Sequence, residues 1–298
     1  MLSVTQFTTV IRFLEEAVER IPLPASSRHL ASIPLRQPGK VLAGAERPMW
    51  PATVLAVCAA ASGDARIGSK VAAAVEIFIA ALDVLDEVED GDKSPLVETA
   101  GVAQALNIST LLLMLAQATL LNLTEDGMTP ARTLLFAKTL AEAGLEATGG
   151  QHRDLTAERD LALSYDDALL TARLKAGVLV ACACKLGALV ATDDPELLAL
   201  YYDWGLHYGT AAQLSNDLHD VEDQEDKSDI ARQKGTLPLL YGRGESVTEE
   251  ASNPTSSGAL HFTWVVLEIE RQHCAEIADK LAARGQAAES LRALLGSV

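Results

Sequence analysis

The stretch IGSKVAAAVEIFIAALDVLDEVEDGD at residues 67–92 decides the fold. Residues 67–85 are mostly apolar, which predicts a helix with neighbours on most of its surface. Its end is acidic: Asp83, Asp86, Glu87 and Asp90 are spaced at i, i+3, i+4 and i+7, so a helix places these carboxylates on one face. Because stacked like charges destabilise an isolated helix, the pattern favours a bound cation.

A second acidic cluster, QLSNDLHDVEDQEDKSD at 213–229, follows the uncharged stretch WGLHYGTAA. Its polar residues again follow three-and-four spacing, at Gln213, Asn216, Asp217, Asp220 and Gln224. If the two clusters face each other across a helical bundle, their oxygens suit Mg²⁺, which prefers oxygen ligands. The alternative is that both are solvated helix ends of an acidic protein.

The rest of the chain favours an all-α fold, because aromatic residues make up only 4% and no Asn-Gly or Asp-Gly hairpin joins alternating runs. We expect one domain over 1–298, a helical bundle. Two stretches, Pro22–Pro51 and 242–258, are interpreted as surface loops. Helices are predicted at 3–20, 50–62, 65–90, 98–123, 130–148, 165–192, 195–220, 230–242 and 260–294.

Charge excludes some partners. The chain of 298 residues has 24 Lys and Arg against 41 Asp and Glu, a net charge of −17, so nucleic acid and anionic membranes are poor partners. The segment Thr99–Thr124 has no charge and is long enough to span a bilayer, yet scattered polar residues favour a buried central helix.

The termini and cysteines favour a cytoplasmic protein. The first residues do not resemble a signal peptide, because acidic residues soon follow a weak apolar stretch. Cys58, Cys182, Cys184 and Cys274 form no CxxC pair and suit a reducing compartment, and Cys182 and Cys184 are predicted to be small buried hydrophobes.

Taken in order, elements covering about residues 38 to 242 resemble the trans-isoprenyl diphosphate synthase (polyprenyl synthetase) family. The family's two DDxxD motifs resemble Asp86-Glu87-Val88-Glu89-Asp90 and Asn216-Asp217-Leu218-His219-Asp220. Three further elements are GGQHRDL at 149–155, similar to GQ-x-x-D-L, LKAG at 174–177, similar to the Lys-Thr element, and QKGTLPLLYG at 233–242, similar to GK-x-TLP. The resemblance implies an isoprenoid synthase-type bundle around a central apolar cavity.

The same resemblance implies a Mg²⁺-dependent prenyltransferase, and a homodimer, that ionises an allylic prenyl diphosphate and condenses it with isopentenyl diphosphate into a longer trans-polyprenyl diphosphate. The catalytic residues it implies are Asp86, Asp90, Lys175 and Asp217. The metal ligands are Asp86, Glu87, Asp90, Asn216, Asp217 and Asp220. The substrate-binding residues are Lys40, Arg47, Lys93, Gln151, Lys175, Gln213, Lys227 and Lys234, with Arg232 as a further candidate.

The resemblance implies that the residues one to two helical turns before Asp86, the first Asp of the first motif, limit the length of the product. Ala81 and Ala80 are small, and Phe78 is the first bulky aromatic residue, a little over two turns away at about 1.5 Å per residue. We therefore expect a product of C20 or longer, inside apolar walls that exclude water from a carbocation.

Two departures from the family keep alternatives open. Residues 38–48, PGKVLAGAERP, space Lys40 and Arg47 further apart than the family's GGK-x-x-RP does. Lys93 is the only basic residue in GDKSPLVE, where the family has an Arg-Arg pair. The alternatives are a transferase with another acceptor, a non-catalytic subunit of a two-chain synthase, or a class I terpene synthase. The stretch NDLHDVEDQ resembles the Asn-Ser-Glu metal motif of class I terpene synthases. In such an enzyme Arg173 would sense pyrophosphate.

The remaining histidines and glutamates define no second motif. A di-iron carboxylate bundle needs Glu-x-x-His twice, and Glu270-Arg271-Gln272-His273 is one match. His219 and His152 lie inside the quoted elements. Each is interpreted either as a residue that contacts diphosphate or as an ordinary surface histidine. His29, His207 and His261 carry no motif.

Overall fold

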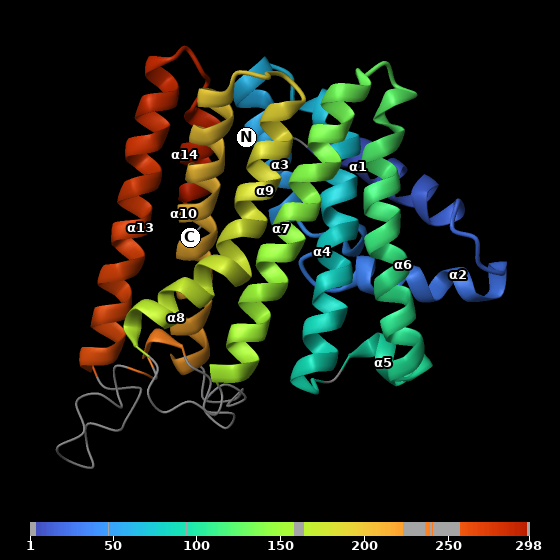
Figure 1. Ribbon diagram of the computed structural model, residues 1–298, viewed down its shortest axis with the longest axis horizontal. Helices are drawn as coiled ribbons and strands as arrows, with labels where there is room; N and C mark the ends of the chain where they lie inside the picture. Colours follow the sequence, from blue (N-terminus) through green and yellow to red (C-terminus); the bar gives the residue numbers. More distant parts are fainter. Residues whose placement is uncertain are drawn as a thin grey trace. The chain divides into compact units, whose positions relative to one another are not determined.

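A computed structural model describes residues 4–46, 48–92, 94–157, 164–222, 236–238, 240 and 257–296. Every regular element within these ranges is a helix, which confirms the all-α prediction (Figure 1). The chain forms two compact units, the first from Met1–Leu140 and Ala183–Leu198 and the second from Ala141–Cys182 and Ala199–Val298. The expectation of one domain stays a prediction.

The first unit is built around α4 (Ser69–Asp90), which packs along α6 (Val102–Leu121) and against α1 (Val4–Glu19) and α3 (Met49–Ser62) (Figure 1). Both sides of α4 are apolar up to Ala81, so neighbours cover it as its sequence predicts. The hydroxyl of Ser109 on α6 donates to the Ala81 carbonyl at 2.8 Å. The wall of α4 next to the acidic cluster is therefore covered by α6.

Helix α4 ends at a glycine that the sequence places directly after the acidic cluster. Gly91 has φ 67°, in the left-handed region, and the N–H of Asp92 donates to the Glu87 carbonyl at 2.9 Å. This is the Schellman arrangement that ends many helices. The carboxylates of the cluster consequently occupy the C-terminal end of the helix.

The stretch Pro22–Pro51, predicted to be a surface loop, is instead folded onto the first unit. It contains α2 (Ala25–Ser32) and the short 3-10 helices η1 (Pro34–Arg36) and η2 (Val41–Ala43). Ala31, Leu35 and Val41 are buried. Its prolines start or interrupt short helices rather than abolish them, because proline is tolerated at a first helical turn.

The second unit contains the end of α7 (Pro130–Ala157), α8 (Tyr165–Ala172), a π-helical turn at Arg173–Gly177, α9 (Val178–Leu189) up to Cys182, and most of α10 (Pro195–Glu222). Tyr201 and Trp204 on α10 are its largest buried side chains. Helix α7 is longer than predicted and includes the whole GGQHRDL element.

The C-terminal segment, predicted as one helix over 260–294, is two helices, α13 (Ser257–Ala283) and α14 (Glu289–Leu295). The chain turns at Gly285, which has φ 79°. Three shorter elements belong to the described part of the first unit: α5 (Pro95–Ala100) before α6, and the 3-10 helices η3 (Ala65–Gly68) and η4 (Asn122–Thr124).

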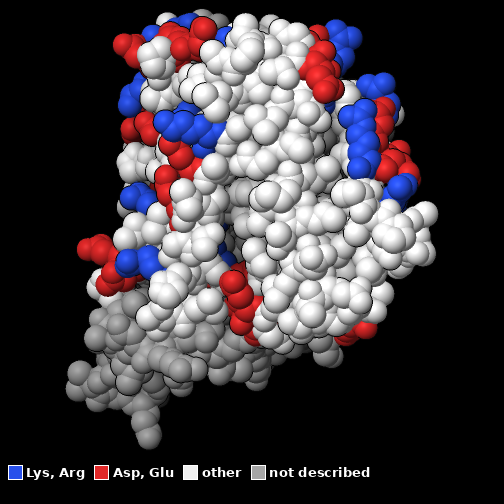
Figure 2. Space-filling model, turned by 45° about the vertical axis from the view of Figure 1, so that its right-hand side comes forward, with Lys and Arg blue, Asp and Glu red and all other residues white. Residues whose placement is uncertain are grey.

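Helix α6 is not buried all round, so the prediction of a buried central helix is wrong. Among the described residues one segment, Val102–Thr124, is long and apolar enough to cross a bilayer, judged by length and composition alone, and 39% of its most apolar window is buried. Leu106, Met114 and Leu121 are exposed. One side of α6 packs on α4 while the other forms part of a broad surface with few charges (Figure 2).

The cysteine prediction is confirmed for Cys182 and Cys184, which are buried in α9. Cys58 and Cys274 are buried as well.

Candidate active site

The first acidic cluster lies half-buried at the C-terminal end of α4. Asp86, Glu87 and Asp90 are partly exposed, and Asp83 is exposed. Burial raises the pKa of Glu87, and the charges of Asp83, Asp86 and Asp92 raise it further, against a hydrogen bond with Ser94. The partial negative charge of a helix C-terminus adds to the same repulsion. Within the described residues the carboxylates raise one another's cost of ionisation, and a divalent cation would offset that cost.

Among the described residues, Lys40 is a basic residue that the structure brings to this cluster. Its side chain is only 7% exposed, and its Nζ lies 2.7 Å from Oδ2 of Asp83. Together with Glu87, Trp50 and Ser94, these residues line a pocket of about 430 Å³ in the first unit. A buried ammonium beside a carboxylate cluster is suited to an anionic group that approaches the pocket.

Sequence reasoning missed Glu76, which holds the loop that carries Lys40. Glu76 is fully buried in α4, and its Oε1 accepts the backbone N–H of Val41 at 2.8 Å. Among the described residues its Oε2 has no hydrogen-bond partner. A glutamate inside the apolar run VAAAVEIFIA was the available signal, because a buried charge without a role is rare.

The second acidic cluster lies at the C-terminal end of α10, which ends at Glu222. Asp217 is 6% exposed, and the Nε2 of Gln213, one turn earlier, donates to its Oδ1 at 2.8 Å. Asn216 and Asp220 are exposed. Like the first cluster, this group places carboxylates where the helix dipole is already negative.

Lys175 lies in the π-helical turn, where its Nζ is 3.0 Å from Oδ2 of Asp154 on α7. Gly150 permits this approach: a Cβ there would lie 2.7 Å from the backbone of Leu174 and Lys175. Within the described part of the chain, both amide atoms of Gln151 are buried without a hydrogen-bond partner. The GGQHRDL and LKAG elements, separate in sequence, thus form one polar group in the second unit.

Several predicted residues lie outside the described residues, namely Arg47, Lys93, Gln224, Lys227, Arg232 and Lys234. The described part of the TLP element, residues 236–238, contributes Leu237 to an apolar cluster with Leu214 of α10 and Leu267 of α13.

Comparison with known proteins identifies the family. Residues 36–254 match the model of the polyprenyl synthetase family, and the chain belongs to this family. It is 32% identical to geranylgeranyl diphosphate synthase of Mycobacterium tuberculosis over 67% of this chain and 60% of that protein. It is 30% identical to the tryptophan prenyltransferase ComQ of Bacillus subtilis over 59% of this chain and 54% of that protein. The matches therefore span little more than half the length of these relatives.

A solved structure shows the same fold. The polyprenyl synthase of Caulobacter crescentus CB15, crystallised with calcium and isoprenyl diphosphate, matches with a TM-score of 0.73 and 24% identity, covering 98% of this chain and 92% of the other. The all-α isoprenoid synthase fold predicted from the motifs is confirmed.

Proposed function

We propose that this protein is a Mg²⁺-dependent prenyltransferase that joins an allylic prenyl diphosphate to isopentenyl diphosphate and releases a longer trans-polyprenyl diphosphate. The observation that carries the proposal is the ordered set of motifs inside the matched region, with both acidic clusters at helix C-terminal ends. The relative named geranylgeranyl diphosphate synthase supports the same activity.

The residues present fit Mg²⁺. Asp86, Glu87 and Asp90 offer carboxylate oxygens on one face of α4, and Asp217 and Asp220 offer them on α10. Burial, and after it the charges of Asp83, Asp86 and Asp92, raise the pKa of Glu87, and a bound cation would offset both effects. Asn216, which is exposed, would be a further ligand. That the two clusters face each other stays a prediction. Calcium in the Caulobacter enzyme's crystals supports a divalent cation in this fold.

Bound Mg²⁺ would neutralise the charge that develops on the departing pyrophosphate. In the proposed reaction the C–O bond of the allylic diphosphate breaks, and pyrophosphate leaves with the electron pair. Lys175 would donate hydrogen bonds to the diphosphate, while Asp154 holds its ammonium in place. The amide of Gln151, which has no hydrogen-bond partner among the described residues, would bind the same group.

The prenyl chain needs apolar surroundings that exclude water. Ala80, Ala81 and Phe78 on α4 are buried and lead into the first cluster. The double bond of isopentenyl diphosphate then attacks the allylic carbon, and loss of a proton restores a double bond in the product. Lys40 would bind the diphosphate of this second substrate, since its ammonium already lies in the pocket beside Asp83.

A transferase with another acceptor is the second candidate. The family's Arg-Arg pair after the first motif is absent from GDKSPLVE, and a relative over more than half of this chain is a tryptophan prenyltransferase. Such an enzyme keeps the metal site and the allylic site but needs no second diphosphate site. A terpene synthase and a non-catalytic subunit are not favoured by the named synthase relatives.

We also propose a cytoplasmic homodimer that associates through α6. Two copies of a protein with a net charge of −17 repel each other. An interface between them is therefore least unfavourable where the surface carries few charges. From Thr99 to Thr124 the chain carries no charge, and Met114 on this helix is 60% exposed. Figure 2 shows a broad surface with few charges on the side of the molecule that carries α6.

The decisive experiment incubates purified protein with Mg²⁺ and geranyl, farnesyl or geranylgeranyl diphosphate, with and without isopentenyl diphosphate, and identifies products by mass. Longer diphosphates that require isopentenyl diphosphate establish chain elongation. Prenylated tryptophan, formed when tryptophan replaces isopentenyl diphosphate in the incubation, establishes the second candidate. Hydrocarbon or alcohol from the allylic diphosphate alone contradicts both.

A further inference from the structure

Glu270 is a buried carboxylate of α13 that the proposed reaction does not use. Its side chain is 3% exposed, and each of its two carboxylate oxygens makes a hydrogen bond with a different residue. Arg173 of the π-helical turn donates to Oε1 at 2.9 Å, and Nδ1 of His207 on α10 lies 2.5 Å from Oε2. One carboxylate therefore links three segments of the second unit that are distant in sequence.

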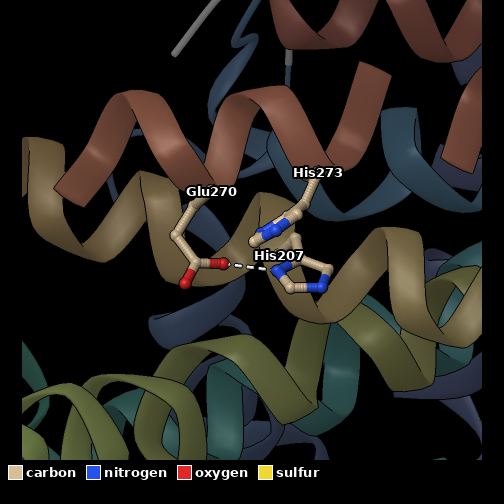
Figure 3. A group of neighbouring side chains, drawn as sticks. All are labelled: His207, Glu270 and His273. Atoms are coloured by element: carbon tan, nitrogen blue, oxygen red, sulfur yellow. Dashed lines mark hydrogen bonds and ion pairs between the residues drawn. The ribbon is translucent and has the colours of Figure 1, made fainter. Parts of the chain in front are cut away.

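His273 lies one turn after Glu270 on α13 and turns its ring toward His207. The two ring centroids are 4.7 Å apart, with the planes tilted by 45° (Figure 3). Among the described residues Nδ1 of His273 is buried without a hydrogen-bond partner. A buried ring nitrogen of this kind normally has a partner, since desolvation without one costs about 1–3 kcal/mol. The orphaned nitrogen indicates a ligand.

The three side chains together form a donor set for a metal ion. His207, Glu270 and His273 each offer a ligand atom, and these atoms lie within 4.8 Å of one another. Tetrahedral Zn²⁺ with bonds of about 2.0–2.2 Å separates its ligands by roughly 3.3 Å, so small side-chain rotations bring the three to that spacing. Two imidazoles with one carboxylate favour Zn²⁺ and related transition metals over Mg²⁺.

We propose that His207, Glu270 and His273 bind one Zn²⁺-type transition-metal ion that clamps α13 to α10. The single Glu-x-x-His match on α13 is half of a di-iron signature, and the structure completes it with one imidazole from α10, which makes a site for one metal rather than two.

The surroundings fit this assignment. Arg173 donates to Oε1 and orients the carboxylate, as hydrogen bonds to ligating carboxylates do in known metal sites, while the metal would replace the proton shared between Oε2 and Nδ1 of His207. Cys274, the residue after His273, is not part of the donor set, because its buried Sγ donates to the Trp204 carbonyl at 3.6 Å. Water takes the fourth position.

The test titrates Co²⁺ into the untagged full-length protein in excess Mg²⁺, which occupies sites made of oxygen ligands alone. We expect one equivalent of Co²⁺ to bind with the strong visible absorption of a tetrahedral site, and one equivalent of Zn²⁺ to remove that absorption. Zn²⁺ should also raise the melting temperature, because a ligand that binds only the folded protein stabilises it.

The informative variant is His273→Ala. Without metal, Nδ1 of His273 makes no hydrogen bond within the described residues, so removing the ring leaves the hydrogen bonds of Glu270 intact. Losing a direct ligand should weaken binding by more than the roughly 10–100-fold cost of losing an outer hydrogen bond. The matched control is His261→Ala, an exposed histidine of the same helix, which should bind as the wild type does.

Circular dichroism would confirm that both variants keep their helices. Wild-type protein without tetrahedral absorption, or a folded His273→Ala variant that binds Co²⁺ as tightly as the wild type, would overturn the proposal.

Discussion

The ammonium of Lys40 lies 2.7 Å from the carboxylate of Asp83, one helical turn before Asp86. Lys40 is distant from the acidic cluster in sequence, and the folded stretch Pro22–Pro51 brings it there. The contact offsets part of the cluster's negative charge. In the proposed function, Asp83 would hold the Lys40 ammonium in place until a diphosphate binds.

The first prediction concerns this lysine. Lys40→Met should raise the KM for isopentenyl diphosphate by about 10-fold or more, because a hydrogen bond to a charged group contributes about 1.5–3 kcal/mol. The KM for the allylic diphosphate should change little, as steady-state kinetics with each substrate varied would show. The matched control is Lys70→Met, which removes another lysine of the first unit, 2.7 Å from Asp126. An unchanged KM for isopentenyl diphosphate would point to a different acceptor.

The second prediction concerns the proposed metal ligands. Asp86→Asn and Asp217→Asn should each lower kcat by at least about 100-fold, the scale of losing a group that stabilises transition-state charge. Mg²⁺ titrations of turnover would measure the effect, with the exposed Glu125→Gln as the control that keeps activity. Full activity in either aspartate variant would remove that residue from the site.

The third prediction concerns product length. Ala81 is buried one turn and a half before Asp86, and Ser109 of α6 is bonded to its carbonyl, so a larger side chain there has little room to move aside. Ala81→Phe should shorten the product, and Phe78→Ala should lengthen it. Mass spectrometry of products made from the same substrates distinguishes the variants. A product of unchanged length from Ala81→Phe contradicts a role for this wall of α4.

The fourth prediction uses Glu76. Burial raises the pKa of this carboxyl above its ordinary value of 4.5, although Lys40 and the Val41 N–H lower it. Because the folded protein then holds the proton more tightly than the unfolded chain, this stabilising contribution is present below pH 4.5 and is lost as the pH rises through the folded pKa.

Glu76→Gln keeps an oxygen for the Val41 N–H but cannot ionise. Its free energy of unfolding should therefore rise relative to the wild type as pH increases from about 4 to about 8. Urea denaturation at several pH values measures this difference, and the exposed Glu98→Gln should show none. A difference that stays constant with pH would mean that the pKa of Glu76 is the same in the folded protein as in the unfolded chain, which contradicts the prediction.

The fifth prediction concerns the uncharged surface of α6. Met114→Glu should convert a homodimer to monomers, since it places a charge on an apolar surface that would become buried. Sedimentation velocity measures the change. Ile67→Glu, an exposed apolar residue of η3, is the control that should leave the assembly intact. A wild-type protein that sediments as a monomer contradicts the proposed dimer itself.

The sequence by itself determined the helical class, most helix positions and the two acidic helix ends. These features are local: helical periodicity, proline at helix starts and Gly91 after the acidic cluster all act within a few residues. Where competing local signals met, the prediction failed. The prolines of Pro22–Pro51 concealed α2, and the uncharged composition of α6 concealed an exposed side, because composition does not say which face a neighbour covers.

Only the tertiary structure decided which distant residues meet. Lys40 reaches Asp83, Lys175 reaches Asp154, and His207 reaches Glu270 through contacts between elements far apart in the chain. A lone histidine carries no motif, and one Glu-x-x-His is half a signature. His207, Glu270 and His273 lie together because α13 packs against α10. The free energy of that packing is distributed over buried apolar surface, which no short motif encodes.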